Sequence, residues 1–411
     1  MRVLVIGNGA REHAIVKSLA ESGANISSFM SHMNPGIVKY ADHIKYGAYN
    51  DFDALLEFKN IDLAVIGSEK AVISGMVDYL NTIDIPVVAP TKAAARIETS
   101  KIFARKLLDN HRIKGNPDFD VINDLNQFDS IASKYKKLVI KPDGYTGGIG
   151  VKIIGKQLNN FEEARFYAKE LLHDNNQFLI EEFLEGHEFT IHAFCDGSRI
   201  ELTPMVHDYR TNEIRHSLGS VSAPNQLWPG ITKEDVDEAK KIIRNAFRAM
   251  FQEYGVMYQG VLNGQFIKTE DGVYLLEFNC RFGDPEALNV LKLLKTDFLE
   301  LCSKIIDNNM GKPEFHNNIG TMALYLVPKG YPDKIVHDSV VEVPENFNID
   351  YYWGHIYQET PNDPIRTTNK RTLALFRSGE SISEIRKFLI ASAEHIKGDL
   401  EYSKIVGQEF D

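Results

Sequence analysis

A short segment near residue 280 combines the side chains that a phosphate-transferring site needs. Glu277 and Asn279 lie two positions apart, so on a β-strand both side chains face the same side. A carboxylate beside an amide oxygen suits a hard cation such as Mg²⁺, held between protein and phosphates. Arg281 continues along this face, where its charge can stabilise a phosphoryl group in transfer. The alternative is a buried polar strand end, which requires another partner for Glu277 because an unpaired buried carboxylate is costly.

A glycine-rich segment lies earlier in the chain. Residues 141–151 read Lys-Pro-Asp-Gly-Tyr-Thr-Gly-Gly-Ile-Gly-Val, with a predicted strand on each side. The glycines make a loop with exposed N–H groups, and Lys141 at the end of the first strand can point at the same place. The segment is not a P-loop, which needs a terminal Gly-Lys-Ser/Thr and a following helix. We favour a loop that closes over nucleotide phosphates; the alternative is a long hairpin loop.

A second glycine turn opens the chain. Residues 7–13 read Gly-Asn-Gly-Ala-Arg-Glu-His between a predicted strand and helix, and N–H groups at a helix N-terminus bind anions. Glu12 stands where a dinucleotide-binding fingerprint has its third glycine, so that fingerprint fails. Arg11 suits a terminal phosphate. The alternative is a tight turn with a surface arginine.

An acidic cluster follows the predicted strand at 178–183. Glu181 and Glu182 face opposite sides of that strand, and Glu188 lies just beyond. One of these carboxylates can accept a hydrogen bond from an adenine amino group or a ribose hydroxyl; the alternative is a solvated edge. The scattered histidines show no metal-ligand spacing, so we expect structural or surface roles for His13, His187, His192 and His207.

The elements that position these residues indicate an α/β protein. Buried strands at 3–6, 63–66 and 85–89 alternate with helices, which predicts a parallel sheet, and a helical pattern runs from 91 to 108. Gly115 to Pro117 then breaks the chain. Beyond the break, helical spacing between Thr232 and Gly255 predicts a helix, and the turn at 269–272 predicts a hairpin of 256–268 with 273–279. Further strands are expected at 119–122, 138–141, 151–154, 178–183, 188–194, 200–206, 321–327 and 372–376, with a helix at 161–172.

Composition narrows the class of protein. The chain has 411 residues, a net charge of -11 and 43% hydrophobic residues, which predicts roughly three globular domains and argues against a disordered chain. The acidic balance argues against a nucleic-acid partner. Three cysteines without a CxxC pair exclude a disulfide scaffold and suit the cytoplasm. No apolar run reaches the roughly 18 residues of a membrane span, so we expect no membrane partner.

Taken in order, these segments resemble the phosphoribosylamine–glycine ligase (glycinamide ribonucleotide synthetase) family of the ATP-grasp superfamily, particularly its archaeal-type members. The most specific match is Asn-x-Arg-Phe-Gly-Asp-Pro-Glu at 279–286. The other matching segments are 3–13, 62–69, 98–108, 141–151, 179–194 and 255–291, with 330–332 and 371–379 near the end.

The resemblance implies an ATP-grasp fold with an N-terminal parallel-sheet domain and a small mixed α/β C-terminal domain. The expected divisions are 1–100 for the phosphoribosyl side, 118–186 for the ATP-grasp cap, 187–320 for the central catalytic subdomain and 321–411 for the C-terminal domain. The implied activity joins glycine to 5-phosphoribosylamine through an acyl phosphate, giving glycinamide ribonucleotide, ADP and phosphate in purine biosynthesis. A monomer or weak homo-oligomer is expected.

The resemblance also implies a role for individual residues. ATP would be bound by Lys101, Lys141, Gly147, Gly148, Glu181, Glu182, Phe183, Leu184 and Glu188. Mg²⁺ or Mn²⁺ would be held by Gln265, Glu277 and Asn279. The phosphoribosylamine and glycine side would include Gly9, Arg11, Glu12, Asp208 and Arg210, and the catalytic residues would be Arg281 and Asp284.

Two segments depart from the family pattern. Ile149 replaces a lysine of the glycine loop, and residues 207–221 lack the Asn-Thr-Gly-Gly-Met-Gly stretch that the family has near its substrates. Arg210 and Arg215 are candidates to replace the missing cation. Two alternatives therefore stay open: a ligase for a different amino acid or amine, and a catalytically silent nucleotide-binding relative. The retention of Glu277, Asn279 and Arg281 together argues against the silent relative.

Overall fold

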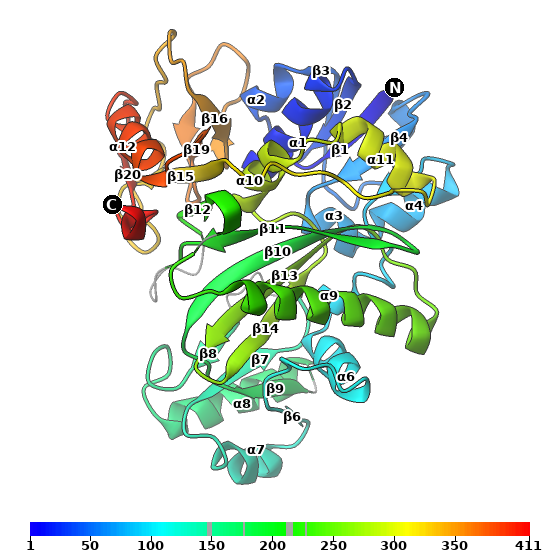
Figure 1. Ribbon diagram of the computed structural model, residues 1–411, viewed down its shortest axis with the longest axis vertical. Coiled ribbons are helices and arrows are strands. Elements are labelled where there is room, and N and C mark those ends of the chain that lie inside the picture. Colours follow the sequence, from blue (N-terminus) through cyan, green and yellow to red (C-terminus); the bar gives the residue numbers. More distant parts are fainter. Residues whose placement is uncertain (146–149, 176, 211–216, 227) are drawn as a thin grey trace.

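The computed structural model describes residues 1–411 except 146–149, 176, 211–216 and 227 (Figure 1). The described strands form sheets of five, four, nine and two strands. None of the described helices combines the length and the apolar character that crossing a membrane requires. Ile149, Arg215, Gly147 and Gly148, which the sequence singles out, lie outside the described residues.

The N-terminal sheet is parallel, as predicted. Its order is β3(Ala41–Tyr46), β2(Asn25–Met30), β1(Arg2–Ile6), β4(Leu63–Ile66) and β5(Val87–Val88). Val3 and Val5 pack into one hydrophobic cluster while Leu4 and Ile6 pack into another, so β1 is buried on both faces. The helices of this region are α1(Ala10–Glu21), α2(Pro35–Val38), α3(Glu69–Ser74) and α4(Met76–Thr82), with a 3₁₀ turn η1(Asp53–Glu57).

The helical pattern predicted from 91 to 108 is interrupted. It consists of α5(Arg96–Thr99) and α6(Lys101–Asn110), and Ser100 between them is extended, with φ −131° and ψ 109°. The Ser100 hydroxyl accepts a hydrogen bond from Phe103 N at 3.1 Å and caps α6. The cap turns the chain so that Lys101 begins a new helix at the edge of the site.

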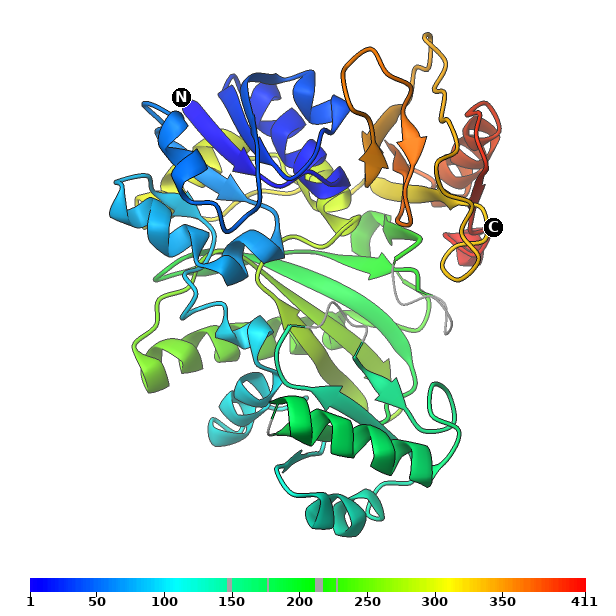
Figure 2. The same cartoon turned by 180° about the vertical axis from the view of Figure 1, so that it is seen from behind.

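The cap unit has its own sheet and core. Its antiparallel order is β6(Phe119–Ile122), β9(Phe178–Glu182), β7(Leu138–Pro142) and β8(Lys152–Ile153). The helices α7(Leu125–Ala132) and α8(Phe161–Asn175) pack on it around a separate hydrophobic cluster. Figure 1 shows this unit at the lower end of the molecule, and Figure 2 shows it from behind.

The central sheet runs through the middle of the molecule and continues into the C-terminal region. Its order is β14(Gly272–Asn279), β13(Gln259–Thr269), β10(His187–Asp196), β11(Ile200–Asp208), β12(Gly219–Ser222), β15(Gly320–Pro328), β19(Leu373–Gly379) and β16(Asp350–Trp353), with β20(Leu400–Tyr402) beside β15. Because β12 pairs with β15, the sheet continues across the expected division at 320/321. That division therefore stays a prediction.

Helices and small elements complete this part. The predicted helix is confirmed as α9(Lys233–Tyr254), capped by Thr232 and ended by Gly255 at φ 64°, and the predicted hairpin is confirmed as β13 and β14. The remaining elements are η2(Pro224–Gln226), α10(Glu286–Leu293), α11(Phe298–Ile306), β17(Ile356–Tyr357), β18(Arg366–Thr367), α12(Ile382–Ala393) and η3(Gln408–Phe410).

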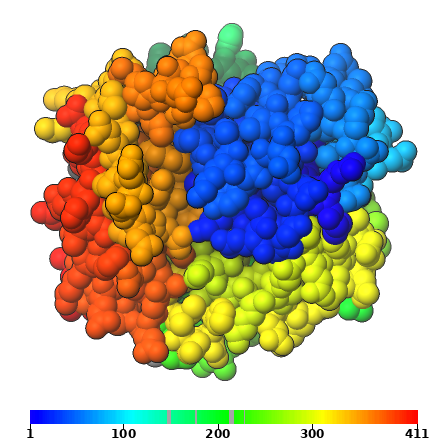
Figure 3. Space-filling view, turned by 90° about the horizontal axis from the view of Figure 1, so that it is seen from above, coloured from blue at the N-terminus to red at the C-terminus, as the bar shows by residue number. Residues whose placement is uncertain are grey.

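The N-terminal and C-terminal regions lie against each other. Figure 3 shows residues near the N-terminus, in blue, directly beside the orange C-terminal segment. His13 Nδ1 accepts a hydrogen bond from Trp353 N at 3.1 Å, and Lys17 pairs with Asp350 at 2.5 Å. The C-terminal region is thereby held next to the carboxyl end of the first strands, where ligands bind in open α/β sheets.

Candidate active site

A cleft of about 730 Å³ lies where the N-terminal sheet, the cap and the central sheet meet. The structure brings together there nine of the site residues that the sequence singled out from distant segments. Those that line it are Arg11, Lys101, Lys141, Glu181, Arg210, Glu277, Asn279, Arg281 and Asp284. Other predicted site residues with described positions do not line it: Gly9, Glu12, Glu182, Phe183, Leu184, Glu188, Asp208 and Gln265.

The hairpin of β13 and β14 places an oxygen-rich set on one wall. Gln265 lies opposite Glu277, and Asn263 lies opposite Asn279. With its amide oriented to satisfy both neighbours, Gln265 donates to Glu277 Oε1 at 2.9 Å and accepts from Arg210 at 2.9 and 3.1 Å. Asn263 Oδ1 is buried without a hydrogen-bond partner among the described residues. This carboxylate and amide set fits a hard divalent cation that shares its remaining positions with phosphate oxygens.

The cap contributes a buried charge network. Glu181 binds Arg105 with both carboxylate oxygens, at 2.8 and 3.0 Å, and Lys141 Nζ donates to Oε2 at 2.6 Å. Burial opposes ionisation of Glu181, but the charges of Arg105 and Lys141 outweigh it and lower its pKa to about 2. The sequence predicted an adenine contact for Glu181. Since both oxygens are already paired, the carboxylate instead holds Lys141 at the cleft.

The start of the glycine loop is docked on α6. Asp143 accepts hydrogen bonds from Ser100 Oγ at 3.0 and 3.1 Å and from Ile102 N at 3.2 Å. Lys101 Nζ donates to Gly144 O at 2.9 Å. Both predicted phosphate-binding lysines, Lys101 and Lys141, therefore line the same cleft from two different segments.

The N-terminal glycine turn differs from the prediction. Gly9 N donates to Glu12 Oε2 at 2.6 Å, and a Cβ on Gly7 would lie 2.4 Å from Glu12 Cγ. The Glu12 side chain thus occupies the N-terminus of α1, where the sequence predicted an external anion. The glycine at position 7, with φ 128°, makes the room for that side chain.

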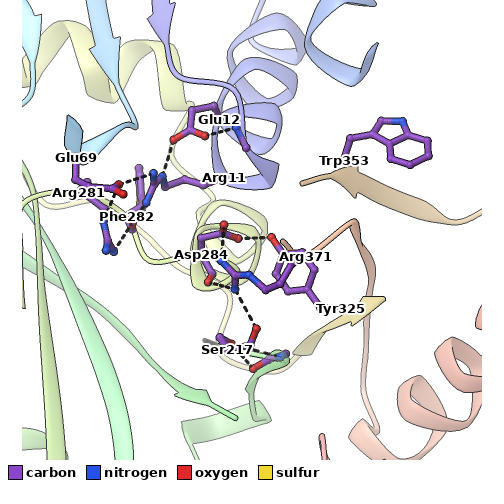
Figure 4. A network of polar contacts seen from close by, with 12 residues as sticks. Arg11, Glu12, Glu69, Ser217, Arg281, Phe282, Asp284, Tyr325, Trp353 and Arg371 are labelled. Carbon is purple, nitrogen blue, oxygen red and sulfur yellow. Dashed lines mark hydrogen bonds and ion pairs between the residues drawn. The ribbon is translucent and has the colours of Figure 1, made fainter. Parts of the chain in front are cut away.

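Arg11 is buried and reaches the cleft, in contrast to the surface arginine of the alternative interpretation. Its Nε pairs with Glu12 at 2.6 Å and its Nη2 with Glu69 at 3.0 Å. Arg281 Nε lies 3.6 Å from the same Glu69 oxygen and has no hydrogen-bond partner among the described residues. Figure 4 shows this cluster of two arginines and two glutamates. Arg281 also lines the cleft, so its charge lies at the site.

Asp284 belongs to a second cluster in Figure 4. Arg371 pairs with Asp284 Oδ2 at 2.9 Å and donates to Asp284 O at 2.8 Å and to Ser217 O at 3.0 Å, while the Tyr325 hydroxyl donates to Asp284 Oδ1. Burial opposes ionisation of Asp284, but Arg371 and Arg11 outweigh it and keep its pKa below the usual value. Asp284 is therefore a fixed anion at the end of the cleft.

The sequence did not predict which residues form the C-terminal wall of the cleft. It is formed by Tyr331, Pro332, His355, Asn369, Lys370 and Arg371. The sequence marked 330–332 and 371–379 as family-like, but no spacing connects them with residue 284. Lys70 also lines the cleft, and burial together with the Lys70 charge lowers the pKa of Lys370. Two ammonium groups thus face one region of the cleft.

The structural roles expected for the histidines are confirmed. His13 accepts from Trp353 N, His192 Nε2 accepts from Gly283 N at 2.9 Å, and His207 stacks on Trp228 at 4.1 Å. Burial lowers the pKa of His13 and His192 to about 3 and that of His207 to about 4. His187 is exposed. The rings of His13, His192 and His207 serve packing and hydrogen bonding in their neutral form.

The arrangement of sheets is found in solved structures. Biotin carboxylase from Campylobacter jejuni shares it with a TM-score of 0.74 at 12% identity, over 99% of this chain and 94% of that one. A phosphoribosylamine–glycine ligase from Thermotoga maritima shares it with a TM-score of 0.83 at 22% identity, over 98% and 99% of the two chains. Together with the match of residues 99–287 to an ATP-grasp domain, the fold and the cleft define an ATP-grasp enzyme.

Sequence comparisons identify the family to which the chain belongs within this fold. Residues 1–98 match the N domain of phosphoribosylglycinamide synthetase, and residues 99–287 match its ATP-grasp (A) domain. Phosphoribosylamine–glycine ligases from Thermococcus gammatolerans and Methanocaldococcus jannaschii are each 37% identical to the chain. The matches cover 99% and 100% of this chain and 94% and 97% of those proteins. The chain belongs to the phosphoribosylglycinamide synthetase family.

Proposed function

We propose that this chain joins glycine to 5-phosphoribosylamine at the expense of ATP, forming glycinamide ribonucleotide, ADP and phosphate. The observation that carries the proposal is that one cleft brings these groups together. It combines a pair of lysines suited to nucleotide phosphates, the Glu277 and Asn279 pair, the guanidinium of Arg281 and a basic wall from the two ends of the chain. Family membership and this combination of groups support the same reaction.

The chemistry explains why such groups are needed. A carboxylate is a poor electrophile, so its oxygen first attacks the γ-phosphorus of ATP, and ADP leaves. The amine of phosphoribosylamine then attacks the acyl carbon, inorganic phosphate leaves, and the nitrogen loses a proton. Positioning and charge neutralisation are the main tasks of the protein in such transfers. Arg281, which lines the cleft with Glu277 and Asn279, is assigned to neutralise charge on the phosphoryl group.

The nucleotide side of the proposal rests on Lys101 and Lys141 for the phosphates. The phosphates are also assigned to Gly147 and Gly148 of the loop. Adenine is assigned to residues 182–184, and ribose to Glu188. Mg²⁺ or Mn²⁺ would be held by Glu277 and Asn279, with Gln265 behind them. When bound, the cation supplies positive charge to the phosphate oxygens.

The missing loop lysine is not replaced by Arg210. Its Nε binds Asp208 at 2.6 Å, and its terminal nitrogens bind Gln265 at 2.9 and 3.1 Å. Since this guanidinium is committed to protein oxygens, Mg²⁺ and backbone N–H groups would carry the neutralisation that the lysine provides in the family pattern.

The phosphoribosyl phosphate is assigned to the basic wall. Lys70 and Lys370 face one region of the cleft, and a dianionic phosphate relieves the repulsion that lowers the pKa of Lys370. Lys370→Ala is expected to raise KM for phosphoribosylamine roughly 10-fold, because a charge-assisted hydrogen bond is lost, with little change in KM for ATP. Steady-state kinetics measures both constants. Lys397→Ala, on an exposed lysine paired with Glu342, is the control. Equal effects of the two variants would contradict the assignment.

The activity itself is tested by ADP release in a coupled assay with phosphoribosylamine and a panel of amino acids. Release that depends on both phosphoribosylamine and glycine is expected. Dependence on another amino acid would establish the ligase with a different substrate, and no release with any would establish the silent relative.

The proposal includes the cellular compartment and the oligomeric state of the enzyme. Cys195, Cys280 and Cys302 are free and buried, which suits the reducing cytoplasm. A monomer or weak homo-oligomer is expected, and sedimentation velocity over a range of concentrations measures it.

A further inference from the structure

Glu98 lines the cleft from α5, and the reaction described above does not use it. Its carboxylate Oε2 accepts a hydrogen bond from Cys280 N at 2.6 Å, across 182 positions of the chain. Cys280 stands between Asn279 and Arg281, and both of these neighbours line the cleft. The side chain of Glu98 therefore holds the backbone at the point from which two site residues project.

The strand end needs this acceptor because the sheet no longer provides one. β14 is an edge strand of the central sheet, so it has a neighbouring strand on one side only. Its pairing with β13 ends where Asn279 lies opposite Asn263, and Cys280 lies beyond this last pair. Cys280 is only 1% exposed. A buried N–H group without an acceptor costs free energy comparable to a lost hydrogen bond, and the carboxylate of Glu98 removes that cost.

A second contact attaches the same residue to α5. The thiol of Cys280 donates to Ala95 O at 3.7 Å, and Ala95 directly precedes α5. Both the backbone and the side chain of Cys280 are thus bound to this helix. Two contacts on one residue determine the direction of the strand end as well as its position. They therefore also determine where the side chains of Asn279 and Arg281 point.

The segment that carries Glu98 also carries a lysine assigned to the phosphates. Ser100 ends α5 and caps α6, whose first residue is Lys101. Asp143, at the start of the glycine loop, accepts hydrogen bonds from the Ser100 hydroxyl and from Ile102 N. Residues 98–102 thereby connect the end of β14, the lysine and the start of the loop.

We propose that Glu98 is a positioning residue that acts through the amide of Cys280. It keeps Asn279 and Arg281 in place relative to Lys101. The inference rests on the proposed function, which assigns these three side chains to the cation and the phosphates. A displacement of about 1 Å in an active site can lower the rate roughly 100-fold although every reacting group is present. The hydrogen bond therefore matters for the rate without contact between Glu98 and a reacting atom.

Two variants separate the hydrogen bond from the charge. Glu98→Ala removes the acceptor, and kcat should fall roughly 100-fold. Glu98→Gln keeps an oxygen that accepts from the N–H but lacks the added strength of a charge, so kcat should fall no more than about 10-fold. The loss should appear in kcat more than in KM for ATP, because the displaced groups act on the transition state. Steady-state ADP release measures both constants.

Asp196→Ala is the matched control. The buried carboxylate of Asp196 also accepts from a distant backbone N–H, that of Met310 at 3.1 Å, but Asp196 does not line the cleft. This variant should unfold at a lower temperature than wild type, and its kcat, measured well below that temperature, should equal the wild-type value. A loss of kcat equal to that of Glu98→Ala would show that activity follows general stability, which would overturn the inference.

Two further readouts follow the path of the effect. Hydrogen exchange at the Cys280 amide should be slow in wild type and in Glu98→Gln, and roughly 10-fold faster or more in Glu98→Ala. If Glu98 acts through Arg281, the double variant Glu98→Ala/Arg281→Ala should be less than about 10-fold slower than Arg281→Ala alone, whereas independent effects would multiply. Unchanged exchange, or effects that multiply, would overturn the inference.

The remaining outcomes are also decisive. A folded Glu98→Gln variant with the full loss of the alanine variant would show that the charge itself is needed, and a shifted Mg²⁺ dependence would identify a metal ligand; either result overturns the positioning role. If Glu98→Ala does not fold, Glu98→Gln decides by the same criterion. Wild-type protein that releases no ADP with phosphoribosylamine and glycine contradicts the proposed function. An active wild type whose Glu98→Ala variant is unimpaired contradicts the positioning role alone.

Discussion

Replacing Glu277 by glutamine is expected to lower kcat/KM roughly 1,000-fold, of the order found when a preorganised electrostatic group is removed from an active site. Glu277 provides the negative charge of the Glu277 and Asn279 set, while Gln265 and Asn279 contribute neutral amides. Glutamine can still accept from the Gln265 amide, so the hairpin should keep its register and the free energy of unfolding should change little. Steady-state ADP release at a series of Mg²⁺ and Mn²⁺ concentrations measures the effect.

A matched control for Glu277→Gln exists on the same hairpin. Glu270→Gln lies in the exposed turn between β13 and β14, and it should leave kcat/KM unchanged. If Glu277→Gln is as active as wild type at ordinary Mg²⁺, the metal assignment is wrong. If it is inactive but has also lost its cooperative unfolding transition, the carboxylate supports the hairpin instead.

Local patterns were sufficient for much of the fold. The helix α9 has a polar cap at Thr232, regular apolar spacing and glycine at 255, so its bounds follow from short-range chemistry. The hairpin that carries Gln265 and Glu277 follows in the same way from its turn. Two strands of the N-terminal sheet were missed for the opposite reason. β2 contains adjacent serines, and β3 is an edge strand whose residues are half-buried or exposed, so neither shows a buried apolar run.

The parts of the site that escaped prediction depend on contacts between distant residues. Arg371 reaches Asp284 across 87 positions, and Trp353 binds His13 across 340. No periodicity in the chain records such pairs. Glu12 and Glu181 show a related effect. The carboxylate of Glu12 occupies the helix N-terminus where the sequence suggested an external anion, and that of Glu181 binds Arg105 and Lys141 where the sequence suggested adenine. A charged residue in a motif can serve the protein itself, and only the partners decide which role it has.

The carboxylate of Glu181 gives the second large expected effect, this time on stability. Glu181→Ala would leave Arg105 and Lys141 in a buried position without their anion; the side chains of Arg105 and Glu181 are each only 3% exposed. Removing one partner of a buried ion pair costs about 3–5 kcal/mol, because the remaining charge is neither hydrated nor paired. Equilibrium unfolding in urea should show this loss. Glu170→Ala, on an exposed position of α8 in the same unit, should change the free energy of unfolding by less than about 0.5 kcal/mol.

The dependence of this effect on pH follows from the sign of the pKa shift. Arg105 and Lys141, against the opposing effect of burial, lower the pKa of Glu181 from 4.5 to about 2. A carboxylate with a lowered pKa in the folded state stabilises the fold fully above its unfolded pKa, and that stabilisation is lost as pH falls towards the folded value. The difference in unfolding free energy between wild type and Glu181→Ala should therefore be constant near neutrality and decrease below about pH 4.5. A difference that stays constant down to pH 3 would show that Glu181 stabilises the cap through packing, because packing does not titrate.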